Sequence, residues 1–142
     1  MADFPRVTVT STGTPWRVDI ADGTHRWLAD EPAGAGGGDA GPSPTQLLCS
    51  SLGACTTITV QMYAARKHWP LEGIEVTVTM NAAGKPADGA TELKREIVLR
   101  GTLDAEQRER LLDIANKCPI HKVLSGAVRI ATELAPHPDP LP

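Results

Sequence analysis

Two cysteines, Cys55 and Cys118, are the residues of this chain that are best suited to redox chemistry. A cysteine thiolate is a nucleophile that an oxidant can convert to a sulfenic acid, and a second thiol then closes a disulfide. The two residues lie far apart in the sequence, so no spacing rule connects them and only the fold could bring them together. The third, Cys49, is six residues before Cys55. That spacing turns it roughly 240° around a helix, so we assign Cys49 to packing.

Cys55 lies near the middle of a stretch, residues 43–65, that has no charged side chain. Gly53 and Ala54 beside it leave room for a substrate or for the backbone of a partner. Its neighbours on one helix face form an apolar groove with a few hydroxyl groups: Leu48, Ser51, Ile58, Thr59 and Met62. The alternative is that Cys55 is simply a small buried hydrophobic residue.

The surroundings of Cys118 favour a thiol of altered pKa. Lys117, His121 and Lys122 are close in the sequence and could stabilise a thiolate. A helix that restarts at Pro119 would place Cys118 at its N-cap, where the helix dipole favours a negative charge. The alternative is a cysteine that merely closes the preceding helix.

Two further motifs are incomplete. Gly36-x-Gly38-x-x-Gly41 matches a dinucleotide-binding fingerprint, but prolines flank it and no parallel β-α-β pattern surrounds it. Cys118-x-x-His121 is half of a zinc pattern without a second Cys/His pair. We therefore predict no metal and no cofactor.

Composition indicates a soluble, single-domain protein of 142 residues. The net charge of -3 gives no electrostatic reason to bind nucleic acid or an anionic membrane. The uncharged stretch is rich in Ser, Thr, Gln and Cys, which argues against a membrane span. The N-terminus lacks the basic and apolar regions of a signal peptide. We predict a cytoplasmic protein with reduced cysteines.

The elements that must position the cysteines follow from periodicity and end signals. Ser43, Pro44 and Gln46 supply an N-cap, a proline at the first helical position and a capping box, and Pro70 prevents continuation. They predict a long central helix. Asp104 and Gln107 form a second capping box that opens a helix running to about residue 117.

Alternating apolar residues predict strands near residues 6–10, 16–20, 25–29, 74–80, 93–99 and 128–134. The predicted order is β-β-β-α-β-β-α-β, an α+β fold with one largely antiparallel six-stranded sheet. A single sheet covers only one side of an uncharged helix, so we expect an intertwined homodimer. We expect one domain over residues 1–134 and a disordered tail over residues 135–142.

Several runs of the sequence resemble the OsmC/Ohr family of osmotically inducible and organic-hydroperoxide-resistance proteins. The matching runs are residues 30–32 (DEP), 41–48 (GPSPTQLL), 52–56 (LGACT), 62–64 (MYA), 71–76 (LEGIEV) and 117–121 (KCPIH). The resemblance covers about residues 5–134 and is closest to the general OsmC-like branch.

The resemblance implies a thiol-dependent peroxidase acting on organic hydroperoxides at a dimer interface. Cys55 would be the peroxidatic residue and Cys118 the resolving residue, and a dithiol such as dihydrolipoamide would reduce their disulfide. In Ohr-type members a Glu, where this chain has Gln46, holds an Arg over the thiolate. The nearest candidate for that Arg is Arg17, with Arg26 second. The alternative function is a non-catalytic OsmC-like protein that binds a small hydrophobic ligand at the dimer interface.

Overall fold

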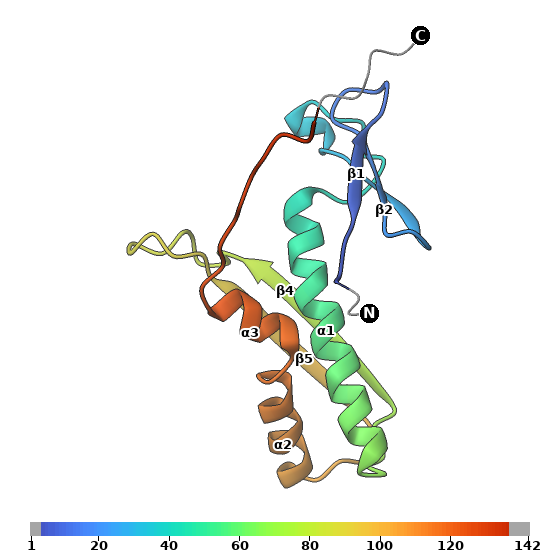
Figure 1. The fold of residues 1–142 in the computed structure, drawn as a ribbon. Coiled ribbons are helices and arrows are strands. Elements are labelled where there is room, and N and C mark those ends of the chain that lie inside the picture. Colours follow the sequence, from blue (N-terminus) through green and yellow to red (C-terminus); the bar gives the residue numbers. More distant parts are fainter. Residues whose placement is uncertain (1–3, 137–142) are drawn as a thin grey trace.

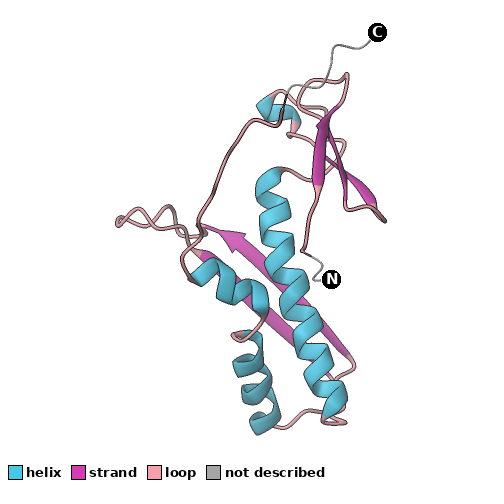
Figure 2. Cartoon of the chain, viewed as in Figure 1, coloured by secondary structure: helices cyan, strands magenta, loops and turns pink. Residues whose placement is uncertain are grey.

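The computed structural model describes residues 4–136 of the chain, whose elements are arranged around one long helix (Figures 1 and 2). In chain order they are β1 (Thr8–Ser11), β2 (Val18–Ala21), β3 (Arg26–Ala29), the 3-10 helix η1 (Ala33–Ala35), α1 (Pro44–Arg66), β4 (Gly73–Met80), β5 (Leu93–Arg100), α2 (Ala105–Ala115) and α3 (Pro119–Ser125).

The predicted start of the central helix α1 is confirmed. The Ser43 side chain accepts a hydrogen bond from the Gln46 N–H, and the Gln46 side chain accepts one from the Ser43 N–H. These two bonds satisfy donors that the first helical turn leaves free. The helix ends at Arg66, before Pro70. The second predicted capping box, between Asp104 and Gln107, likewise opens α2.

One side of α1 is buried and the other is open. The buried residues recur every four positions, which marks a single stripe: Leu52, Thr56, Val60 and Ala64. The helix as a whole packs against β4, α2 and α3. Val60 and Ala64 form the hydrophobic core with Leu111, Ile114 and Ala115 of α2. By length and composition α1 could cross a membrane, which is weak evidence because core helices of soluble proteins pass the same test.

The sheet expected from the sequence is divided in two. β1, β2 and β3 form an antiparallel three-stranded sheet, and β4 and β5 form a separate antiparallel pair. The pair lies along α1, whereas the three-stranded sheet sits beyond the N-terminal end of α1 (Figure 1). The prediction of one six-stranded sheet is therefore wrong for the single chain. The pairing fails because the loop before α1 carries the first three strands away from β4 and β5.

Two predictions for the C-terminal part also need correction. The predicted strand over residues 128–134 has no regular structure. Its side chains find no partner strand, and Ile130 and Leu134 are 87% and 98% exposed. The predicted order counts one helix here, whereas the structure has two, α2 and α3, because Pro119 restarts a helix; the restart itself, with Cys118 as the N-cap, is as the sequence indicated. Most of the expected disordered tail, residues 137–142, lies outside the described residues.

Candidate active site

The fold brings Cys55 and Cys118 together. Cys55 lies in the middle of α1 and is half-buried, and Cys118 is fully buried where α3 begins. Both sulfurs accept hydrogen bonds from backbone N–H groups of the first turn of α3. The Ile120 N–H donates to Cys55 Sγ over 3.5 Å, and the His121 N–H donates to Cys118 Sγ over 3.3 Å. The packing of α3 against α1 thus places both thiols in one cluster.

A cation that the sequence analysis did not single out, Arg95 of β5, lies beside this cluster. Its Nη1 is 4.0 Å from Cys118 Sγ and donates to Thr56 Oγ1 over 2.9 Å. Thr56 is buried on α1, and its hydroxyl lies 3.7 Å from the same sulfur. The guanidinium also donates to the Ala115 carbonyl, to Asn116 Oδ1 over 2.8 Å and to His121 Nδ1 over 3.0 Å. One side chain therefore ties α1, β5, α2 and α3 together around Cys118.

These contacts favour the charged form of Cys118. Burial is the largest single influence and acts to raise the pKa of the thiol. Hydrogen bonds from the His121 backbone and from the side chains of Thr56 and Cys55 act in the opposite direction, as does the positive charge of Arg95. Together they hold the pKa of Cys118 below its ordinary value. The buried thiol is thus poised for nucleophilic attack on a neighbouring sulfur.

The other charged neighbours proposed for Cys118 play smaller parts. Lys117 and Lys122 are exposed. His121 acts through its backbone N–H and through Nδ1, which must accept because a guanidinium can only donate. No group of three or more His, Cys, Asp or Glu residues that could hold a metal ion occurs in the part of the chain that the structure describes.

Arg17, the cation expected beside Cys55, lies instead in the N-terminal part of the fold. Its Nε is 3.6 Å from Oδ2 of Asp30, a carboxylate that is almost fully buried. Asp30 also accepts from the Glu31 N–H over 2.8 Å and the Ala40 N–H over 3.1 Å. Within the described residues of one chain, Arg17 makes no hydrogen bond or ion pair with Cys55. Its assignment as the activating cation stays a prediction.

Asp30 fixes the loop between β3 and α1, and its contribution to stability should depend on pH. The hydrogen bond from Ala40 is the main cause that lowers the pKa of Asp30, burial opposes it, and Arg17 adds to the lowering. A carboxyl with a lowered pKa stabilises the fold above its unfolded value of about 3.9 and loses that effect as the pH falls through its folded value.

We therefore expect Asp30→Asn to lower the urea midpoint at pH 7, and the difference from wild type to shrink towards pH 3. Asp39→Asn, an exposed position in the same loop, is the matched control and should change the midpoint little at either pH. A difference for Asp30→Asn that stays constant between pH 7 and pH 3 would contradict this assignment.

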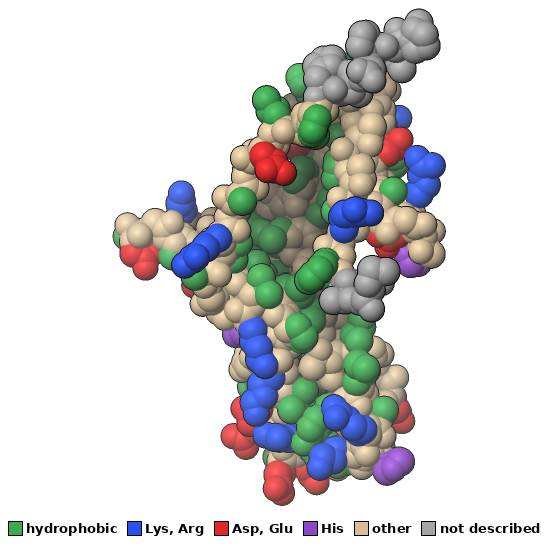
Figure 3. Space-filling model, viewed as in Figure 1, with side chains coloured by type: hydrophobic (Ala, Val, Ile, Leu, Met, Phe, Trp, Pro, Cys, Tyr) green, Lys and Arg blue, Asp and Glu red, His purple; other side chains and the backbone are tan. Residues whose placement is uncertain are grey.

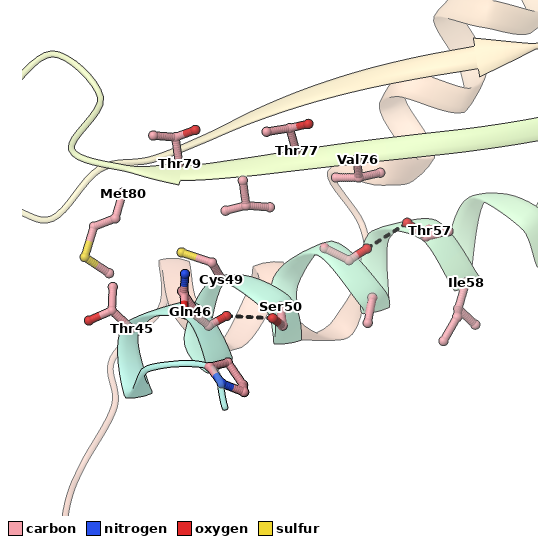
Figure 4. A pocket seen from close by; sticks show the side chains of 14 residues that line it. Thr45, Gln46, Cys49, Ser50, Thr57, Ile58, Val76, Thr77, Thr79 and Met80 are labelled. Carbon is pink, nitrogen blue, oxygen red and sulfur yellow. Dashed lines mark hydrogen bonds between the residues drawn. The ribbon is translucent and has the colours of Figure 1, made fainter. Parts of the chain in front are cut away.

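Gln46 and Cys49 belong to a different surface from the thiol cluster. Gln46 completes the cap of α1. Cys49 is half-buried and lines an open groove of about 980 Å³ between α1 and β4. In Figure 4 its sulfur points into the space between helix and strand, whereas Ile58 points away from the strand. Cys55 is not among the residues that line this groove.

Sequence reasoning missed Arg95 although a signal was present. Strand alternation places Arg95 on the same side as Ile97 and Leu99, which pack against the hydrophobic core. A charged residue at an inward position of a strand is unusual and needs a partner. That partner set, Thr56, Asn116 and His121, comes from three other elements, so no local pattern could identify it.

Comparison with known proteins finds one matching family model and solved structures of similar fold. The family model for OsmC-like protein matches residues 36–133 of the chain. No curated protein matches it significantly. An OsmC-like protein from Mycoplasma pneumoniae has a similar structure, with 20% identity and a TM-score of 0.72 over 89% of this chain and 90% of that one.

Two structures of organic hydroperoxide resistance proteins are also similar. The protein from Legionella pneumophila has 22% identity and a TM-score of 0.61 over 89% of this chain and 92% of that chain. The corresponding values for OhrB from Bacillus subtilis are 25% and 0.59, over 87% and 92%.

Proposed function

We propose that this chain, which belongs to the OsmC-like protein family, is a thiol-dependent peroxidase that reduces organic hydroperoxides. The main support is that two free cysteines lie together in different environments. Cys55 is half-buried, whereas Cys118 is fully buried. A more accessible thiol suits the oxidant, and a buried thiol with a lowered pKa suits the second step. Similarity to proteins named for hydroperoxide resistance agrees with this assignment.

The proposed cycle uses one oxidation and one reduction. The Cys55 thiolate attacks the terminal peroxide oxygen, the O–O bond breaks, and the alkoxide takes a proton and leaves as an alcohol. The sulfenic acid that forms on Cys55 is attacked by the Cys118 thiolate, which gives a disulfide and releases hydroxide that is protonated to water. A dithiol such as dihydrolipoamide then reduces the disulfide and is itself oxidised. The cycle requires no metal and no bound cofactor.

We propose a homodimer as the working state. Large apolar side chains are exposed on α1, among them Leu48, Ile58 and Met62. Figure 3 shows apolar surface gathered around the hollow between the N-terminal sheet and the C-terminal segment. Contiguous exposed apolar surface of this kind marks an interface. A second copy would cover it and could bring Arg17 of one subunit to Cys55 of the other. OsmC-family proteins are soluble, and we propose a cytoplasmic location.

A peroxidase assay tests the proposal. Reduced wild-type protein with dithiothreitol should consume cumene hydroperoxide or t-butyl hydroperoxide, and Cys55→Ser should not exceed the rate without protein. Cys49→Ser is the matched control, because it removes another half-buried cysteine of the same helix, and it should retain the wild-type rate. The peroxidase assignment is wrong if wild type consumes no more peroxide than Cys55→Ser.

The groove between α1 and β4 favours a second candidate, a protein that binds a small hydrophobic ligand without catalysis. Its walls include Val76, Val78 and Met80 of β4 and Ile58 of α1. This function predicts that decanoic acid binds by calorimetry while the peroxidase assay shows no activity. Peroxide consumption that depends on Cys55 would exclude the non-catalytic assignment.

A further inference from the structure

Arg95 is a half-buried cation with no carboxylate partner among residues 4–136. Its hydrogen-bond acceptors are neutral: the Thr56 hydroxyl, the Ala115 carbonyl, Asn116 Oδ1 and His121 Nδ1. The Ala115 carbonyl belongs to the last turn of α2, so it contributes only the partial negative charge of a helix C-terminus. Charges removed from water are normally compensated by an opposite charge. The group placed to supply it here is Cys118, whose sulfur is 4.0 Å from Nη1.

We infer that Arg95 is a positioning residue that holds Cys118 as a thiolate and makes it the leaving group when the disulfide is reduced. The inference rests on the proposed two-cysteine cycle and adds the direction of its last step. Cys118 is fully buried and Cys55 is partly exposed. An external thiol therefore reaches the Cys55 sulfur, and the thiolate that departs is the one beside the guanidinium.

A dithiol reduces the disulfide by two successive thiol–disulfide exchanges. A thiolate of the dithiol attacks Cys55 Sγ, a new S–S bond forms to the reductant, and the Cys55–Cys118 bond breaks with its electron pair on Cys118. The second thiol of the reductant then loses its proton and attacks the reductant's own mixed-disulfide sulfur. Cys55 leaves as a thiolate, and the reductant departs as a cyclic disulfide. A stabilised leaving thiolate accelerates the first of these attacks.

A purely structural role for Arg95 is the competing explanation, since its hydrogen bonds join four elements. The two roles differ in what they predict for the ionisation of Cys118. The titratable or charged groups in contact with Cys118 or Arg95 are Cys55 from α1 and His121 from α3. From α2 the contacts are the uncharged Ala115 carbonyl and Asn116. Replacing Cys49 and Cys55 leaves Cys118 as the one thiol that titrates, and His121 is the same in every variant that is compared.

The test is a thiolate titration at 240 nm in Cys49→Ser/Cys55→Ser protein, which keeps Cys118 as its one thiol and keeps a hydroxyl donor at position 55. The expected midpoint lies below the ordinary value of about 8.5. Adding Arg95→Met should raise the midpoint by about 1 pH unit, the lower end of the effect of a neighbouring charge, and Arg95→Lys should restore part of the difference. Arg100→Met, an exposed arginine on the same strand, is the matched control and should leave the midpoint unchanged.

A midpoint at or above 8.5 with Arg95 present, or one that Arg95→Met does not move, would overturn the inference. If Arg95→Met does not fold, the midpoint with Arg95 present and the Arg95→Lys midpoint decide it. No peroxide enters this experiment, so a failed peroxidase assay and a failed titration are separate results.

The direction of reduction has its own test in Cys49→Ser protein. Diamide closes the Cys55–Cys118 disulfide without peroxide, and limiting glutathione followed by an acid quench traps the mixed disulfide. Peptide mass spectrometry should locate glutathione on Cys55. Glutathione found mainly on Cys118 would show that Cys118 is the attacked sulfur and would overturn the assignment of the leaving group.

Discussion

Ile58→Lys is expected to convert the protein from a dimer to a monomer. Ile58 is 54% exposed on α1, at the rim of the groove, and its side chain points away from β4 (Figure 4), so in one chain a lysine at this position can extend into solvent. In the proposed dimer it lies between subunits. Burying a side chain of this type contributes about 1.5–3 kcal/mol, and an unpaired ammonium group in its place would cost several kcal/mol more. Light scattering after size-exclusion chromatography measures the mass directly.

Val98→Lys is the matched control for this substitution. Val98 is 46% exposed and lies on the side of the β4–β5 pair that carries Glu75, its partner across the strands. A lysine there adds the same charge on a polar surface and should leave the dimer intact. A wild-type protein that runs as a monomer would refute the proposed dimer. If Ile58→Lys protein remains a dimer, this face of α1 is not part of the interface.

The part of the fold that could be predicted from the sequence is the part set by neighbouring residues. Ser43 with Gln46, and Asp104 with Gln107, are three residues apart and define helix starts through local hydrogen bonds. Alternation located β4 and β5 for the same reason. The division into two sheets was not predictable, because strand pairing depends on where the loop before α1 directs the chain.

The exposed C-terminal segment shows the same limit. Val128 and Ile130 alternate as a strand would, but a strand exists only when a neighbouring edge supplies hydrogen-bond partners. In a single chain both side chains remain exposed. The alternating pattern therefore predicted a segment that can pair as a strand, but within residues 4–136 the single chain provides no strand edge for it to pair with.

The candidate active site likewise has features that local sequence predicts and features that depend on the whole fold. Local sequence identified Cys118 as an N-cap before Pro119, and this is confirmed. The meeting of Cys118 with Cys55 could be expected only from resemblance to a family, since the two come from separate helices. Arg95 required knowledge of three other elements at once. Arg17 illustrates the opposite case, because the sequence suggested a cation whose partner in the chain is Asp30.

Cys118→Ser is expected to stop the cycle after about one equivalent of peroxide per subunit, because the sulfenic acid on Cys55 then has no thiol to condense with. Stoichiometric cumene hydroperoxide without reductant should give wild type an intramolecular disulfide, visible by mass spectrometry as a Cys55–Cys118 link. Cys118→Ser should instead give a species that dimedone traps on Cys55. Excess peroxide should carry that species on to sulfinic acid, whereas the disulfide protects wild type.

Cys49→Ser separates this outcome from the general loss of a cysteine. Cys49 lines the groove between α1 and β4, and its sulfur is not part of the thiol cluster. Its replacement should leave both disulfide formation and resistance to excess peroxide as in wild type. A disulfide from Cys49 to Cys55 in the oxidised wild type would mean that the resolving residue is misassigned. Dimedone labelling of the two single-substitution variants tests which thiol meets peroxide first. Cys118 in Cys55→Ser protein should be labelled much less than Cys55 in Cys118→Ser protein. Equal labelling would show that peroxide reaches the buried thiol directly, so that burial of Cys118 does not decide the order of attack.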